Sequence, residues 1–155
     1  MMDQAKTTQT QTNDERTNHA FEAVNAIIKD KRDKAFQKEF RSAARSFPTL
    51  VHNNGLSAAI AFLKVKMNDE DEKENEKKNK NQHDLLFDAL KEWLVKIDRV
   101  SISENESDDQ PKDLLEAVIK LKRDEYRIVT EEVMIYSQWI KRFAEGMLSK
   151  DEQEG

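Results

Sequence analysis

Glycine and proline, the two residues that most often interrupt regular structure, are scarce in this chain. Its 155 residues include only three glycines and two prolines. Long helices form easily in such a chain, whereas the tight turns of β-hairpins, which favour glycine, are poorly supported. Apolar residues recur along the chain at intervals of three and four, as they do on one face of an α-helix. The sequence therefore predicts an all-α protein, a compact bundle of five to six helices.

The apolar seams predict six helices, and the segment around Pro48 is the most informative boundary. We expect helices over about 13–30, 33–46, 48–66, 84–100, 111–122 and 124–148. Pro48 should end the second helix, because the residue before a proline is pushed out of the helical region, and should open the third. From Gly55 to Leu63 the third helix is apolar on most faces, so we expect it at the centre of the bundle.

Two points about these helices stay open. Neither glycine nor proline separates the first two helices, so a break near Lys31 and one continuous helix are both possible. The third helix need not begin at Pro48. In the alternative, Asn53 and Asn54 break the helix, and Gly55 simply follows the break.

Polar segments divide the chain into one helical domain with loops and tails. Charged residues make up 37% of the chain, as do apolar residues, which indicates a modest core under a large charged surface. We expect a disordered polar tail over 1–14, a single helical domain over 15–148, mobile acidic loops at 67–82 and 101–110, and a frayed tail over 149–155. A polar helical extension is the alternative for 67–82, because Glu and Lys are good helix formers.

Residues that could carry catalysis are few. The chain has no cysteine, and three glycines cannot build a glycine-rich phosphate loop. His19, His52 and His83 lack the spacing that places two metal ligands on one helix face. Glu131 and Glu132 point to different helix faces, which favours surface charges over an acid/base pair. We therefore expect no enzyme, no cofactor and no metal.

The ends and the apolar runs of the chain bear on its location. The first 18 residues contain no apolar run of the kind found in signal peptides. No stretch approaches the ~18 apolar residues of a membrane span. Together with the lack of cysteine, these features predict a cytoplasmic protein that does not bind a membrane.

The positive finding is a basic stripe. Residues 22–66 contain nine Lys and Arg against four Asp and Glu, a net charge of +5, although the whole chain carries −5. Four of these cations fall at intervals of four, three and four: Lys34, Lys38, Arg41 and Arg45. They share one face of the second helix, roughly 200° from its seam of Phe36, Phe40 and Phe47, and span about 16 Å. This row suits two or three successive phosphates of a nucleic acid. The alternative is an ordinary solvated face.

The last helix adds a second basic pair, Lys141 and Arg142, for which the alternative role is to complement the helix dipole. Trp139 lies off the apolar seam of that helix. We expect it in the core, with a stacking surface or a protein-contact anchor as the alternatives.

The second helix and the residues after it resemble a known family. The stretch FRSAARSFPTLVHNNGLSAAIAFLKVK, residues 40–66, resembles the signature of the small α-helical subunit of type III-B CRISPR effector complexes, the RAMP module. The shared elements are Arg41, Arg45, Pro48, Asn54-Gly55-Leu56 and Phe62-Leu63. A second block, Tyr126, Thr130, Glu132 and WIKRFAEGM at 139–147, resembles the last helix of that family. The resemblance covers roughly residues 16–148.

The resemblance implies a non-catalytic subunit of an antiviral effector complex in a prokaryotic cytoplasm. Members stack in several copies along the backbone subunits and line the channel where target RNA pairs with guide RNA. By matching position, Arg41, Arg45 and Lys141 would contact the RNA backbone, whereas Lys34 and Lys38 depend on the stripe alone. The acidic segments 67–82 and 101–110 depart from the family pattern.

A helical protein–protein adaptor without a nucleic-acid role is the alternative function. Its anchors would be exposed aromatic residues such as Trp93 or Trp139.

Overall fold

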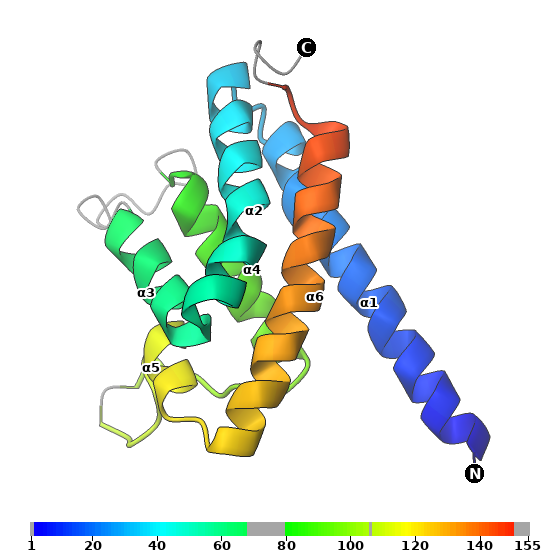
Figure 1. Ribbon diagram of the computed structural model, residues 1–155, viewed down its shortest axis with the longest axis vertical. Coiled ribbons are helices and arrows are strands. Elements are labelled where there is room, and N and C mark those ends of the chain that lie inside the picture. The colour runs from blue at the N-terminus through cyan, green and yellow to red at the C-terminus, as the bar shows by residue number, and fades with distance from the viewer. Residues whose placement is uncertain (1, 68–79, 106, 151–155) are drawn as a thin grey trace.

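Six helices form the structure, a computed structural model that describes residues 2–67, 80–105 and 107–150, with side chains from residue 11 onward. They are α1 Met2–Lys29, α2 Lys34–Asn54, α3 Leu56–Lys66, α4 Gln82–Lys96, α5 Leu114–Ile119 and α6 Arg123–Met147 (Figure 1). No strand occurs within these ranges, so the prediction of an all-α bundle is confirmed. None of the described helices is long and apolar enough to cross a membrane.

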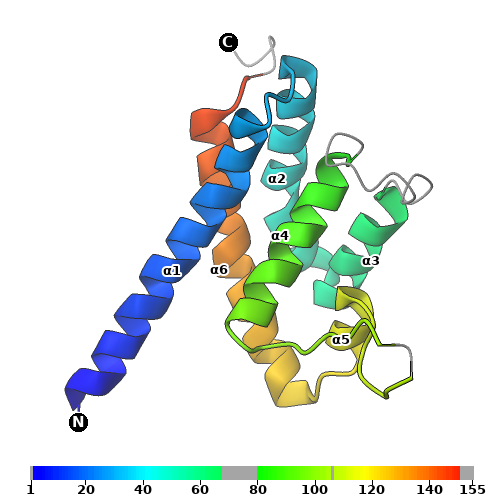
Figure 2. The same cartoon turned by 180° about the vertical axis from the view of Figure 1, so that it is seen from behind.

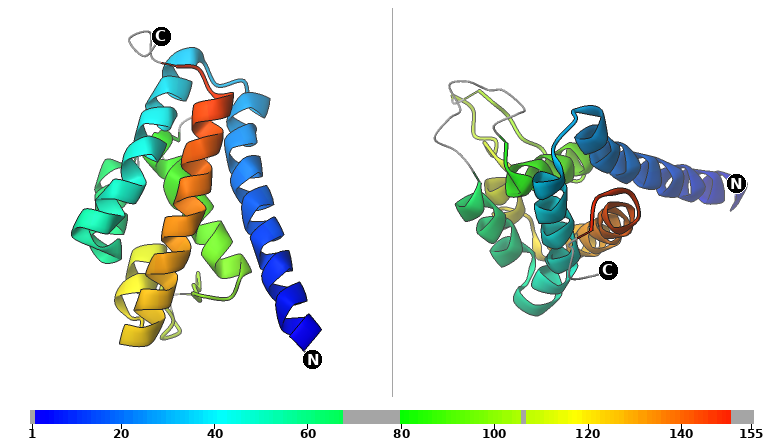
Figure 3. Two further views of the ribbon diagram at one scale, coloured as in Figure 1. Left: turned by 45° about the vertical axis from the view of Figure 1, so that its right-hand side comes forward. Right: turned by 90° about the horizontal axis from the view of Figure 1, so that it is seen from above.

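Helix α6 lies between α1 and α2 and packs against both, with α4 behind it (Figures 1 and 3). Helix α3 packs against α2, α4 and α5 on the other side of the bundle. The N-terminal half of α1 extends away from the rest of the molecule (Figure 1). Residues 2–14 belong to this helix in the structure, although we expected a disordered tail there. The predicted loop at 67–82 and tail at 149–155 lie largely outside the described residues.

The first two helices are separate. Helix α1 ends at Lys29, and Lys31 adopts a left-handed conformation with φ 57°. The Arg32 N–H donates to the carbonyl of Ile27, and the Lys31 N–H donates to that of Ile28, which is the hydrogen-bond pattern of a Schellman motif. The side chain of Asp33 then caps α2 by accepting from the Phe36 N–H at 2.8 Å. Local capping thus produces a break that neither glycine nor proline marks in the sequence.

The prediction that Pro48 ends the second helix is wrong. Pro48 lies inside α2, which continues to Asn54. A proline within a helix has no N–H for the carbonyl four residues earlier and costs roughly 3 kcal/mol. Here Phe47, Pro48 and Val51 are all buried, and their burial offsets that loss. The break between the second and third helices lies instead at Gly55, directly after Asn53 and Asn54. This agrees with the alternative given in the sequence analysis.

Helix α3 is not the centre of the bundle. Its buried residues, Leu56, Ala59, Ile60 and Leu63, form one face. Val65 on the opposite face is 80% exposed, so the helix is covered on one side only. Helix α4 packs against α1, α2, α3 and α6. The seam of Val129, Val133, Tyr136 and Ile140 in α6 is buried as its spacing predicts.

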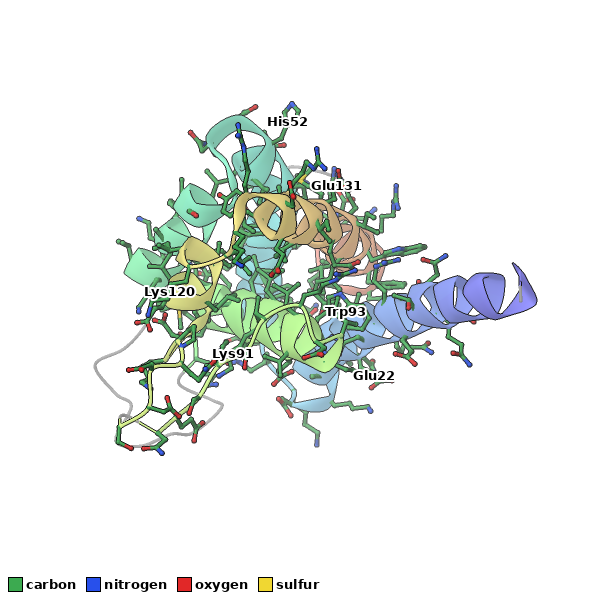
Figure 4. The ribbon with its side chains drawn as sticks, turned by 90° about the horizontal axis from the view of Figure 1, so that it is seen from below. Glu22, His52, Lys91, Trp93, Lys120 and Glu131 are labelled. Carbon is green, nitrogen blue, oxygen red and sulfur yellow. The ribbon has the colours of Figure 1, made fainter. Side chains whose placement is uncertain are left out.

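A buried carboxylate joins three of the helices. Glu132 on α6 accepts from Arg16 Nε at 2.6 Å and Arg16 Nη2 at 2.8 Å, and from Trp93 Nε1 at 2.9 Å. Trp93, which points from α4 into the interior (Figure 4), stacks on Tyr136 with ring centres 5.6 Å apart. The hydroxyl of Tyr136 is in turn 2.6 Å from Nδ1 of His19. The prediction that Glu132 is a surface charge is therefore wrong.

The backbone at Gly55 supplies a stability test. Its φ of 91° and ψ of 162° lie in a region that residues with a Cβ rarely adopt. A Cβ there would meet only the Tyr126 hydroxyl at 3.9 Å, an ordinary contact, so the cost of Gly55→Ala comes from the backbone. We expect the free energy of unfolding to fall by about 2 kcal/mol in urea denaturation followed by circular dichroism.

Gly146→Ala is the matched control, because Gly146 is helical and a Cβ there meets nothing within 4 Å. It should leave stability unchanged or raise it by up to about 1 kcal/mol. Equal losses in the two variants would contradict the assignment of strain to Gly55.

Candidate nucleic-acid interface

The candidate cations lie along the antiparallel pair formed by α2 and α6 (Figure 3). Three contacts fix the register of this pair: the Ser149 N–H donates to Gln37 Oε1 at 3.0 Å, and both Arg41 and Arg45 reach Glu145. The start of α2 therefore lies beside the end of α6. This register brings the four basic residues of α2 to the same side of the bundle as Lys141.

Arg41 does not point outward, contrary to the prediction. It is only 7% exposed, and its Nη2 donates to the backbone carbonyl of Glu145 at 3.4 Å. The reason is that α2 packs on α6 as well as on α3 and α4, so its buried arc is wider than the phenylalanine seam alone. The carbonyls in the last turn of α6 form the negative end of the helix dipole, which makes this a favourable place for a buried guanidinium.

Arg45 is half exposed and forms an ion pair. Its Nε lies 3.3 Å from Oε2 of Glu145, and the two side chains are 42% and 34% exposed. Ion pairs with this much solvent contact are worth at most about 1 kcal/mol. A phosphate group can therefore compete with Glu145 for Arg45.

Lys34 and Lys38 continue the row toward the start of α2. The side chain of Lys34 is exposed, and that of Lys38 is partly buried. No carboxylate of the described residues pairs with either ammonium group. Lys34 thus presents its charge to solvent, and Lys38 is accessible in part.

The second basic pair is split between two faces of α6. Lys141 is partly buried and lies one turn before Glu145 on the side of α2. Arg142 is about 100° further round, exposed, with its guanidinium 5.4 Å from the ring centre of Trp139. Trp139 itself is partly buried and stacks on Phe143 at 5.5 Å. It belongs to a surface aromatic cluster and not to the closed core.

The histidines occupy unrelated positions. Burial lowers the pKa of His19, with a further contribution from Lys96, so its ring is neutral at pH 7 beside Tyr136. Burial also lowers the pKa of His83, whereas His52 is exposed. Within the described part of the chain, no group of three potential ligands is placed to hold a metal ion.

The polar cluster around Glu132 was not predicted, although the sequence contains a signal for it. Glu132 falls three residues after Val129 and four before Tyr136, which places it on the apolar seam of α6. A carboxylate on a buried seam indicates a buried partner, here Arg16. Trp93, proposed as an exposed anchor of an adaptor, is 0% exposed and cannot serve as one.

Two comparisons with known proteins bear on this chain. A family model described as CRISPR-associated protein (Cas_Cmr5) matches residues 12–147. The fold is similar to the crystal structure of a CRISPR-associated Cmr5 family protein from Thermus thermophilus, with a TM-score of 0.59. The two sequences are 24% identical, and the match covers 86% of this chain and 95% of that one. At this identity the structural match supports the fold.

The burial of Arg41 predicts a structural role for it. Arg41→Glu places a carboxylate against the negative end of α6 and should lower the free energy of unfolding by about 3 kcal/mol. Arg45→Glu, at a half-exposed position, should cost at most about 1 kcal/mol. Urea denaturation of the two variants makes the comparison. Equal, small losses would show that Arg41 is not held in the interior.

Proposed function

The chain belongs to the family of CRISPR-associated Cmr5 proteins, and we propose from this membership that it binds the RNA backbone without catalysing a reaction. Family membership makes it a small subunit of a type III-B CRISPR effector complex. In this proposal several copies stack along the backbone subunits of the complex in the cytoplasm. Each copy presents the α2–α6 side to the guide and target RNA.

The observation that carries the proposal is the cationic row along α2 and α6. It consists of Lys34, Lys38, Arg45 and Lys141, with Arg142 on the neighbouring face of α6, and all five side chains are exposed or partly exposed. The α2 part spans about 16 Å at 1.5 Å per residue, a length that matches two or three successive phosphates. Arg41 belongs behind this row, where it holds α2 against the end of α6.

Binding through such a row is independent of base sequence. Lysine and arginine side chains on a helix surface contact phosphates, which position a nucleic acid but carry no sequence information. Specificity in this proposal comes from pairing between guide and target.

A single copy has few free charges, so we propose that its affinity for RNA is weak. Arg45 shares its charge with Glu145, and Lys141 is partly buried. Copies placed side by side would bind one RNA at several points, and the effective concentration of each further contact would then be high. The row therefore acts in the assembled complex.

Charge reversal tests the row. Complexes assembled with the triple variant Lys34→Glu, Lys38→Glu and Lys141→Glu should bind single-stranded target RNA at least about tenfold more weakly at moderate salt. The slope of log K against log salt should become shallower by about 0.7 for each phosphate contact that each copy loses. Titration of labelled RNA over a range of KCl concentrations measures both quantities.

The matched control reverses three cations on the α4 side, Lys91→Glu, Lys96→Glu and Arg99→Glu, which changes the net charge equally. It should leave RNA binding close to that of the wild type. If both triple variants weaken binding alike, only net charge matters. If neither does, the row is a solvated face and the chain is an adaptor.

A further inference from the structure

A groove lies open between α1 and α4. It has a volume of about 280 Å³. Its floor is apolar and built from small or aliphatic side chains: Ala23, Ala26, Ile27, Leu85 and Ala89. Helix α1 packs chiefly against α6 and lies beside α4 (Figure 2). Its alanines line the groove on the α4 side. The groove thus results from the packing of α1 against α6.

Four carboxylates surround this floor: Glu22 and Asp30 from α1 and the turn after it, and Asp88 and Glu92 from α4. Glu22 is only loosely paired, 3.7 Å from Lys29, and both side chains are more than 60% exposed. Among the lining residues, Lys80 is the one cation opposed to these four carboxylates, since His19 is neutral. The rim therefore carries a net negative charge.

Lys80 shows which chemical group this rim accepts. Its Nζ lies 2.5 Å from Oδ2 of Asp88. The hydrogen bond to Asp88 raises the pKa of Lys80, and the negative charges of Asp84 and Glu92 add to the effect. An ammonium group is consequently stabilised at this site by more than one carboxylate.

The groove and the cationic row are built from different helices, because no residue of α2 or α6 lines the groove. In Figure 4, Glu22 of α1 and Lys91 of α4 lie on one side of Trp93, whereas Glu131 of α6 and His52 of α2 lie on the other side. No residue of the cationic row is part of the groove. Phosphates would be repelled by the acidic rim, so a nucleic acid is a poor occupant of it.

We propose that this groove docks a basic segment of another protein subunit of the effector complex. The segment presents lysine or arginine to the acidic rim and places an apolar side chain on the alanine-rich floor, as an amphipathic helix does in a groove between helices. The proposal depends on family membership and not on the RNA contacts of the cationic row.

Charge reversal at the rim tests the groove. The variant Glu22→Lys with Glu92→Lys should bind at least one of the other subunits of its own complex tenfold or more weakly than the wild type does. Each of those subunits is purified and measured separately by biolayer interferometry, at low and at high salt. Added salt should weaken the wild-type interaction, since the rim contributes charge pairs.

The control is Glu104→Lys with Glu131→Lys, which makes the same change of net charge on other surfaces and should leave subunit binding unchanged. The variant Glu22→Gln with Glu92→Gln removes the charge without reversing it and should give a smaller loss of subunit affinity. It provides the test if the lysine variant unfolds. The proposal is overturned if the groove variants bind every subunit as the wild type does, or if the control loses as much.

The RNA measurement separates this proposal from the previous one. The triple variant Lys34→Glu, Lys38→Glu and Lys141→Glu should retain the subunit affinity that the groove variant loses. A groove variant that loses RNA binding but no subunit binding would overturn the proposal of a protein partner.

Discussion

The carboxylate of Glu132 is the contact on which the placement of α1 depends. It belongs to α6, accepts two hydrogen bonds from Arg16 of α1, and accepts a third from the indole of Trp93 of α4. A carboxylate with 11% exposure is costly to bury, and its pairing with an equally buried guanidinium compensates that cost. Removing either partner would leave an unpaired charge in the interior. The apolar contacts of Ala20, Val24 and Ile27 then seal α1 onto the bundle.

The two surfaces with opposite charge follow from this arrangement. Because α1 is anchored to α6 through Glu132, the alanines of α1 face α4 across an open groove with an acidic rim. Helix α2 packs on the other side of α6. The contacts of Gln37 and Arg41 with the C-terminal end of α6 determine where the cationic row lies. A net charge of −5 is therefore compatible with RNA contact, because attraction to a polyanion depends on the local distribution of charge.

Features that depend on one helix could be predicted from the sequence, whereas those that depend on its neighbours could not. The seams of Phe36, Phe40 and Phe47 in α2, and of Leu86, Leu90 and Trp93 in α4, are buried as their spacing predicts. Arg41 was placed on the outer face because a helical wheel shows one seam and not the second flank that α6 covers. The helix-breaking tendency of Pro48 was overridden by its burial. The groove depends on the spacing between α1 and α4, which no local pattern encodes.

The two proposals together place RNA on the α2–α6 pair and a protein segment in the groove between α1 and α4. Site-specific photocrosslinking in the assembled complex measures this directly, with p-benzoylphenylalanine introduced at the exposed positions Lys34 and Glu92. We expect a crosslink to RNA from position 34 and a crosslink to another protein subunit from position 92. A crosslink to protein alone from position 34, together with one to RNA from position 92, would overturn this placement of the two partners.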